Sequence, residues 1–385
     1  MKFNKWTLGL AAVGAVSLAS AACADEQMSQ VQTALSQTTI SGYVDTAAIW
    51  RPGTDQSGGV GPKMPDYSFA KNDGFYLNAV DIAIDRPENE TPWAAGYHVE
   101  LMAGPDSVPN VDSSTANFGI RQAYLALRTP VGTSGIDWKV GVWDTIIGYE
   151  STSDPLDPNY TRSYGYSIEP TTHTGILGTY KVNDTISVSG GVANSSSVDD
   201  GTPAAINGTA TYESQKAYMG AVALTAPSSW GWLNGATFNG GVINSIDSVH
   251  NEGTITSWYA GATIPTPMTA LKTGIAYDYR AETEGESWVL GLYASYQFND
   301  KTSFNLRGEY LEDSLDELYG ASVVHRNAAE ELTATLQYNL WANVLSRVEF
   351  RWDHVLHGKP FGINSAGASF RANDFMLALN LIYQF

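Results

Sequence analysis

Residues 372–385, at the C-terminal end of the chain, alternate strictly in polarity. Six apolar side chains fall on one face at period two, and they are Phe375, Leu377, Leu379, Leu381, Tyr383 and Phe385. A strand of about eleven residues is long enough to cross a bilayer, and a lipid-facing strand needs one continuous apolar face. A buried strand of a soluble sandwich rarely needs so long an alternation. The pattern therefore predicts a transmembrane β-strand. Its last aromatics, Tyr383 and Phe385, resemble the terminal signal by which outer-membrane barrels are recognised for assembly.

Alternating runs of this kind recur from Thr39 onward. Counting them predicts sixteen strands, at 39–50, 74–86, 93–103, 117–129, 135–149, 172–182, 184–194, 214–226, 234–246, 253–264, 269–280, 287–299, 301–312, 329–340, 342–354 and 372–385. The count is even, as single-chain bacterial barrels require when both ends face the periplasm. Counts of 14 and 18 stay open, because 214–226 and 234–246 are rich in Gly and Ala.

The connections between these runs alternate in length. Residues 182–184, 265–267, 299–301 and 341–343 are tight turns, whereas 51–73, 104–116, 150–171, 195–213, 312–329 and 354–371 are long and polar. Short periplasmic turns with long extracellular loops are typical of outer-membrane barrels. The predicted fold is therefore all-β, a transmembrane antiparallel β-barrel of about 16 strands.

The N-terminus predicts export. Lys2 and Lys5 precede an apolar stretch from Trp6 to Ala19, and Ala22-Cys23-Ala24 is a small-x-small cleavage site. We expect residues 1–24 to be a cleaved signal peptide, 25–38 a short periplasmic lead and 39–385 the barrel. Lipidation of Cys23 is the alternative, although Ser20 stands where lipoprotein signals carry an aliphatic residue.

Charge and motifs exclude several classes of function. The chain has 21 Lys+Arg against 40 Asp+Glu, a formal net charge of -19, which argues against nucleic acid as a partner. Its one cysteine lies in the predicted leader, so we expect no disulfide. The sequence has no GxSxG, HExxH or phosphate-loop motif, so we expect no catalytic residues, no cofactor and no metal site.

Residues 135–194 carry the most specific stretch of the chain. They contain KVGVWDTIIGYE, then PNYTRSYGYSIEPTTHTG, then TYKVNDTISVSGGVAN, in that order. This stretch resembles the putative β-barrel porin-2 family, the OmpL-like porins, and an early GYVDTAAIW strand is similar in pattern. The resemblance implies an outer-membrane porin fold and brings no catalytic residues.

The connection 150–171 is the candidate pore constriction, because it lies between the fifth and sixth predicted strands and carries Pro155 and Pro158. Its candidate residues are Glu150, Asp154, Asp157, Tyr160, Arg162, Tyr164, Tyr166 and Glu169. Such a loop either folds into the lumen or covers the outer mouth, and both readings stay open.

Charged residues at inward positions of the strands are candidates for the lumen wall. They are His98, Lys139, Arg280, Arg307, Glu309, Arg347, Glu349 and Arg351. They either set a field across the pore or keep the wall polar as solvated pairs. Aromatics near strand ends are expected to form the two interfacial girdles, and these are Trp50, Trp93, Trp143, Trp258, Tyr296, Trp341, Trp352 and Tyr383.

The predicted function is an outer-membrane porin of a Gram-negative cell, a passive channel for small hydrophilic solutes with a mild preference for cations. The alternatives are a channel selective for sugars, amino acids or an ion, and a surface barrel acting as adhesin or receptor. Expected partners are outer-membrane lipid and lipopolysaccharide, the barrel-assembly machinery and small solutes or ions. Both a monomer and a homotrimer are open.

Overall fold

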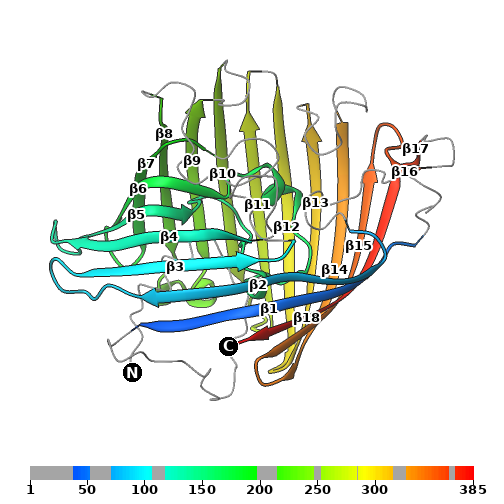
Figure 1. Cartoon of the computed structure of the whole chain (residues 1–385), viewed down its shortest axis with the longest axis horizontal. Helices are drawn as coiled ribbons and strands as arrows, with labels where there is room; N and C mark the ends of the chain where they lie inside the picture. Colours follow the sequence, from blue (N-terminus) through cyan, green and yellow to red (C-terminus); the bar gives the residue numbers. More distant parts are fainter. Residues whose placement is uncertain are drawn as a thin grey trace.

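Sixteen antiparallel strands form one closed barrel (Figure 1). The computed structural model describes residues 38–52, 71–105, 118–196, 215–246, 253–283, 285–314, 327–363 and 369–385. The predicted leader 1–24 and nearly all of the lead 25–38 lie outside these residues. Within the described ranges, no helix is long and apolar enough to cross a membrane.

The strands follow each other around the barrel in chain order. They are β1 (Thr39–Trp50), β2 (Gly74–Arg86), β3 (Ala95–Ala103), β4 (Phe118–Thr129), β5 (Ile136–Asp144), β6 (Thr172–Lys181), β7 (Ile186–Ala193), β8 (Ala217–Thr225), β9 (Thr237–Ile246), β10 (Thr254–Pro265), β11 (Leu271–Ala281), β12 (Glu286–Asn299), β13 (Thr302–Asp313), β14 (Asn327–Trp341), β15 (Val344–Val355) and β18 (Asn373–Gln384). A short hairpin, β16 (Phe361–Ile363) and β17 (Ser369–Arg371), precedes β18 and was not predicted.

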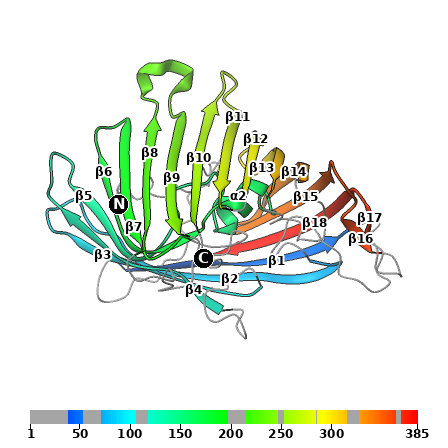
Figure 2. The same cartoon turned by 90° about the horizontal axis from the view of Figure 1, so that it is seen from above.

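Helical turns interrupt two of the connections. The connection between β5 and β6 carries η2 (Asp154–Leu156) and α2 (Tyr164–Ile168), and the turn between β8 and β9 carries η3 (Ser228–Leu233). Seen from above, α2 lies within the ring of strands (Figure 2).

The alternation of the last strand sets its two faces. Phe375, Leu379, Leu381 and Tyr383 are exposed, whereas Met376, Ala378 and Ile382 between them are buried. The exposed side chains therefore form an outer apolar wall, which is the surface that lipid requires.

The barrel closes where β1 meets β18. These strands pair from Tyr43 with Gln384 to Trp50 with Leu377. The terminal residue extends this seam, because the Gly42 amide donates to the Phe385 carbonyl at 3.1 Å and the Phe385 amide donates to the Gly42 carbonyl at 3.0 Å. A closed ring leaves no unpaired strand edge in the membrane.

Two predictions about β5 were wrong. The strand ends at Asp144 and not at 149, because the apolar residues that follow turn into the barrel. Trp143 is no girdle residue, since its side chain is 0% exposed and belongs to an interior cluster with Ile146, Ile147 and Leu177. In contrast, Trp50, Trp93, Trp258, Trp341 and Tyr383 are exposed.

Candidate functional site: a loop folded into the barrel

The connection of residues 145–171, here named the inner loop, enters the barrel at a glycine. The Thr145 amide donates to the Thr171 carbonyl at 2.8 Å, so the two ends of the loop leave the wall together. Gly148 has a φ of +112°, and a Cβ there would collide with the Glu169 carboxylate. Only glycine adopts this conformation without strain, so the position fixes where the chain turns inward.

Apolar side chains attach the first part of the inner loop to the inside of the wall. Ile146, Ile147 and Tyr149 are buried in a cluster that includes Ile243 of β9 and Tyr293 of β12. The rings of Tyr149 and Tyr293 stack with centroids 4.0 Å apart. This packing brings the start of the loop across the lumen toward the far strands.

Three charged residues of β15 hold the tip of the inner loop by its backbone. Glu349 accepts from the amides of Tyr160 at 2.5 Å and Thr161 at 2.9 Å. Arg347 donates to the Asp154 carbonyl at 3.1 Å and also to the Asp157 carbonyl. Arg351 donates to the Arg162 carbonyl at 2.6 Å. Anionic and cationic wall residues thus alternate to meet loop amides and loop carbonyls.

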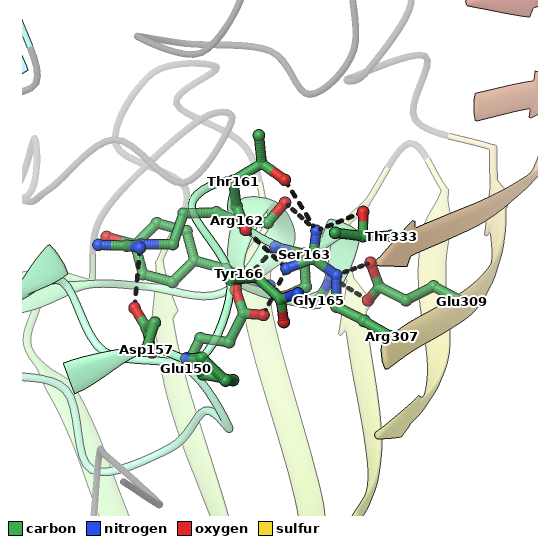
Figure 3. Close-up of polar contacts among 12 residues, drawn as sticks. Glu150, Asp157, Thr161, Arg162, Ser163, Gly165, Tyr166, Arg307, Glu309 and Thr333 are labelled. Atoms are coloured by element: carbon green, nitrogen blue, oxygen red, sulfur yellow. Dashed lines mark hydrogen bonds and ion pairs between the residues drawn. The ribbon is translucent and has the colours of Figure 1, made fainter. Parts of the chain in front are cut away.

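Residues of β13 continue this attachment (Figure 3). Arg307 donates to the Thr161 carbonyl at 2.7 Å and forms an ion pair with Glu150 at 2.7 Å. Glu309 accepts from the amides of Tyr164 at 2.7 Å and Gly165 at 3.3 Å. The loop thus supplies acceptors to Arg307 and amide donors to Glu309, so both charged wall residues have partners although they are buried.

Arg162 folds the tip of the loop onto itself. Its guanidinium lies 2.8 Å from a carboxylate oxygen of Asp154 and 2.8 Å from one of Asp157. Burial alone would lower the pKa of Arg162, but the carboxylates of Asp157 and Asp154 raise it above its ordinary value. The Arg162 guanidinium is therefore a fixed positive charge that neutralises the loop's acidic tip.

Glu169 sits at the other end of α2 in a different setting. Burial raises the pKa of Glu169 well above its usual range, and the neighbouring carboxyl of Asp278 on β11 raises it further. Oε1 of Glu169 and Oδ1 of Asp278 have no hydrogen-bond partner within the described part of the chain. The two carboxyl groups approach each other within hydrogen-bond reach, which favours a proton on one of them.

Every predicted loop residue therefore lies inside the barrel. Of the two readings, the structure shows the loop in the lumen, with Tyr160 and Tyr164 nearly inaccessible. The predicted wall residues divide into three groups. Arg307, Glu309, Arg347, Glu349 and Arg351 lie behind the loop and bind it. His98 and Lys139 line open space on the opposite wall. Arg280 forms an ion pair with Glu282.

The open space is a cavity of about 550 Å³ between the inner loop and strands β1 to β6. Its loop side includes Ser151, Thr152, Pro155 and Tyr166. Along the wall it extends to Glu88 in the turn after β2 and to Phe385 at the end of the chain. Because the loop is fastened to β13 and β15, the open space lies on the β1–β6 side.

Sequence reasoning missed the charged centre of this wall. Arg121 lies 2.7 Å from a Glu100 oxygen and 2.8 Å from an Asp144 oxygen. His98 contacts both Asp85 at 3.1 Å and Glu100 at 3.2 Å. The period-two pattern could have found Glu100, which is two residues after His98.

Arg121 could not be found from period two. Glu100 pairs with Gln122 and Leu101 with Ile120, so Arg121 is the extra residue of a β-bulge. A bulge places two neighbouring residues on one face, and both Arg121 and Gln122 line the cavity. A strict alternation assigns Arg121 to the lipid face.

Acidic groups outnumber basic ones around the cavity. Eight carboxylate side chains line it, against four of Lys and Arg. The carboxylates belong to Asp81, Asp85, Glu88, Glu100, Asp137, Asp144, Glu150 and Glu169, and the cations to Arg86, Arg121, Arg128 and Lys139. In the described residues, no group of three or more His, Cys, Asp or Glu side chains could hold a metal ion.

A closed sixteen-stranded barrel with a lipid-facing apolar wall and a charged inner loop defines the class of outer-membrane porins. The family model "putative beta-barrel porin-2, OmpL-like" matches residues 37–385. The chain therefore belongs to this family, and it is an integral outer-membrane protein that forms a passive channel.

Solved structures share the fold at low sequence identity. The outer-membrane channel DcaP of Acinetobacter baumannii is 11% identical with a TM-score of 0.61, over 93% of this chain and 100% of that one. OmpF of Salmonella typhi, solved with daunomycin, is 14% identical with a TM-score of 0.61, over 93% and 100%. The trimer form of OmpT from Vibrio cholerae is 12% identical with a TM-score of 0.56, over 90% and 99%. No curated protein matches the chain.

Proposed function

We propose that this porin passes small hydrophilic solutes through the cavity beside the inner loop and that it mildly prefers cations. The observation that carries the preference is the lining of that cavity, where six carboxylates stand against four Lys and Arg side chains even without Glu150, which pairs with Arg307, and Glu169, whose pKa is raised. A passage with an excess of one charge enriches the opposite ion.

The positions of the arginines support this preference. Arg307, Arg347 and Arg351 are each at most 2% exposed and donate to the inner loop from behind. They therefore contribute little field to the passage. Arg121, on the open side, is offset by both Glu100 and Asp144.

The inner loop is proposed to set the size limit. It occupies the part of the lumen next to β11, β13 and β15, which leaves solutes the space along β1 to β6. In this proposal, Glu150, Asp154, Asp157, Tyr160, Arg162, Tyr164 and Glu169 shape the constriction by holding the loop's fold, and Ser151, Thr152, Pro155 and Tyr166 face the passage.

Reversal potentials in a KCl gradient test the cation preference. One charge about 5 Å from the ion path is worth about 0.8 kcal/mol in water, and screening at 0.1 M reduces this to about a twofold change in local cation concentration. We expect the Glu100→Gln and Asp85→Asn variants each to lower the cation-to-anion permeability ratio by about that factor. Asp184→Asn is the matched control, because Asp184 is a fully exposed side chain in the turn after β6.

The remaining assignments are proposals of the same kind. Residues 1–24 are proposed as a signal peptide, and Tyr383 with Phe385 as the signal read by the barrel-assembly machinery. Outer-membrane lipid and lipopolysaccharide are the proposed surroundings, and a homotrimer the proposed assembly, since OmpT of Vibrio cholerae was solved in a trimer form. We propose no enzymatic activity. Cross-linking in membranes tests the trimer.

A further inference from the structure

One transverse row of the cavity wall carries opposite charges at its two ends. Lys139 of β5 pairs with Ala126 of β4, and Ala126 pairs with Gly96 of β3. Gly96 in turn lies against the backbone of Glu88, whose amide nitrogen is 2.6 Å from the position a Cβ on Gly96 would take. The register thus places Lys139, Ala126 and Gly96 in one row, and Glu88 lies against its Gly96 end; the four residues are here named the charged row.

The two charged side chains of this row make no direct ion pair among the described residues, and the opposite charges that act on Lys139 from a distance include Asp144, which pairs with Arg121, and Glu88 itself. Among the described residues, Lys139 makes no hydrogen bond or ion pair, and its ammonium lies 4.6 Å from the centre of the Tyr124 ring. Glu88 makes none either, and its Oε2 is buried without a hydrogen-bond partner. Nearby charges are already paired, Arg128 with Asp137 and His98 with Asp85.

The residues between the two charges are small. Ala126 has a short side chain and Gly96 has none, so no long side chain of the row stands between Lys139 and Glu88. Both charged side chains line the cavity. Two strand spacings separate the Cα positions of Lys139 and Gly96, roughly 10 Å, and Glu88 lies against Gly96. Both side chains are long enough to reach inward from these ends, so a small molecule can lie between them.

We propose that the charged row binds small zwitterions, molecules of the α-amino-acid type, with the carboxylate on Lys139 and the ammonium on Glu88. The inference rests on the proposed channel function and adds a solute class to it. Charge-assisted hydrogen bonds at both ends distinguish such a solute from a neutral molecule of the same size. Burial raises the pKa of Glu88 to about 7, with Asp137 adding to the rise, so an arriving ammonium group favours its carboxylate form.

Current block in planar bilayers tests the proposal on the unmodified protein. The probes are L-alanine, its neutral isostere lactamide, and the singly charged analogues lactate and alaninamide. We expect alanine to interrupt the KCl current at a concentration about a hundredfold lower than lactamide, because lactamide loses two charge-assisted hydrogen bonds and each changes affinity by about tenfold. The blocking concentrations of lactate and alaninamide should lie between those of alanine and lactamide. Equal blocking concentrations for all four would overturn the charged row as a binding site.

Two variants assign the effect to this row. Lys139→Gln and Glu88→Gln should each raise the blocking concentration of alanine toward that of lactamide. Lys181→Gln is the matched control, because Lys181 pairs with Asp184 and does not line the cavity. If alanine still blocks both variants as it blocks the wild type, the row is not the site. An inserted wild type that passes neither KCl nor arabinose overturns the channel function, whereas normal arabinose entry without preferential alanine block overturns only the zwitterion site.

Discussion

Replacing Glu349 with glutamine should loosen the inner loop. The Glu349 carboxylate is fully buried and accepts from the Tyr160 amide at 2.5 Å, the Thr161 amide at 2.9 Å and the Thr161 hydroxyl at 2.7 Å. It also accepts from the Thr335 hydroxyl at 2.7 Å. A glutamine keeps one acceptor oxygen and presents an NH₂ group to the partners of the other.

The magnitude follows from these contacts. Losing the bond to the Tyr160 amide removes one hydrogen bond to a charged group, worth about 1.5–3 kcal/mol. The two bonds of Thr161 change from charge-assisted to neutral, which costs roughly another 1 kcal/mol. A total of about 2.5–4 kcal/mol raises the population of a released loop by a factor of roughly 70 to 900. Arg307, Glu309 and Arg351 still hold the loop, so the docked state should remain dominant.

Single-channel recordings measure this change. The Glu349→Gln porin should show brief transitions to a larger conductance, at least roughly 70-fold more often than wild type, with the main level unchanged. Glu312→Gln is the control, since Glu312 is a carboxylate of β13 that makes no hydrogen bond or ion pair among the described residues. Heat-modifiable migration on gels shows that both variants are folded. Equal transition rates in the two variants would refute the loop attachment derived from the structure.

Three further changes have expected outcomes. Replacing residues 153–168 with a short Gly/Ser linker should raise conductance and admit larger sugars in liposome swelling, and an unchanged size limit would place the constriction elsewhere. Deleting Phe385 removes both hydrogen bonds to Gly42 at the seam, so outer-membrane levels should fall, and normal levels would show that the terminal residue is incidental. The pKa of Glu169 is raised when the inner loop is docked, so the protonated Glu169 stabilises the docked loop. This stabilisation is fully present below the ordinary pKa of a glutamate, about 4, and it is lost as the pH rises through the raised pKa. Current noise should therefore increase as the pH rises through the raised pKa of Glu169, and Glu169→Gln, which keeps the group neutral, should abolish that increase.

Most of the barrel can be predicted from the sequence, because apolar and polar side chains must alternate along a strand that crosses a bilayer. Strand ends such as Thr39, Trp50, Gly74 and Arg86 coincide with the predicted ones, since polarity changes there. The prediction was wrong at β5, where the apolar residues Ile146 and Ile147 continue the pattern but pack inside the barrel. Period two distinguishes faces of a strand, and it does not distinguish lipid from an apolar interior.

The candidate site was less accessible to sequence reasoning. The loop's polar residues were identified by their place between strands, yet their partners lie far along the chain, as Glu349 does from Tyr160. Such contacts depend on the ring being closed. Arg121 was not predicted, because a β-bulge turns its side chain from the expected lipid face to the inner face of the wall, and nothing in the local sequence marks that bulge.

The zero-current potential of the wild-type protein in a tenfold KCl gradient tests the central claim most directly. The excess of carboxylates along the β1–β6 wall predicts that K⁺ crosses more readily than Cl⁻, so the dilute side should become positive. The potential should shrink as both solutions are made more concentrated, because salt screens the wall charges. A negative dilute side would mean that Arg121 and Lys139 govern the passage, and an inserted protein without conductance would contradict the channel itself.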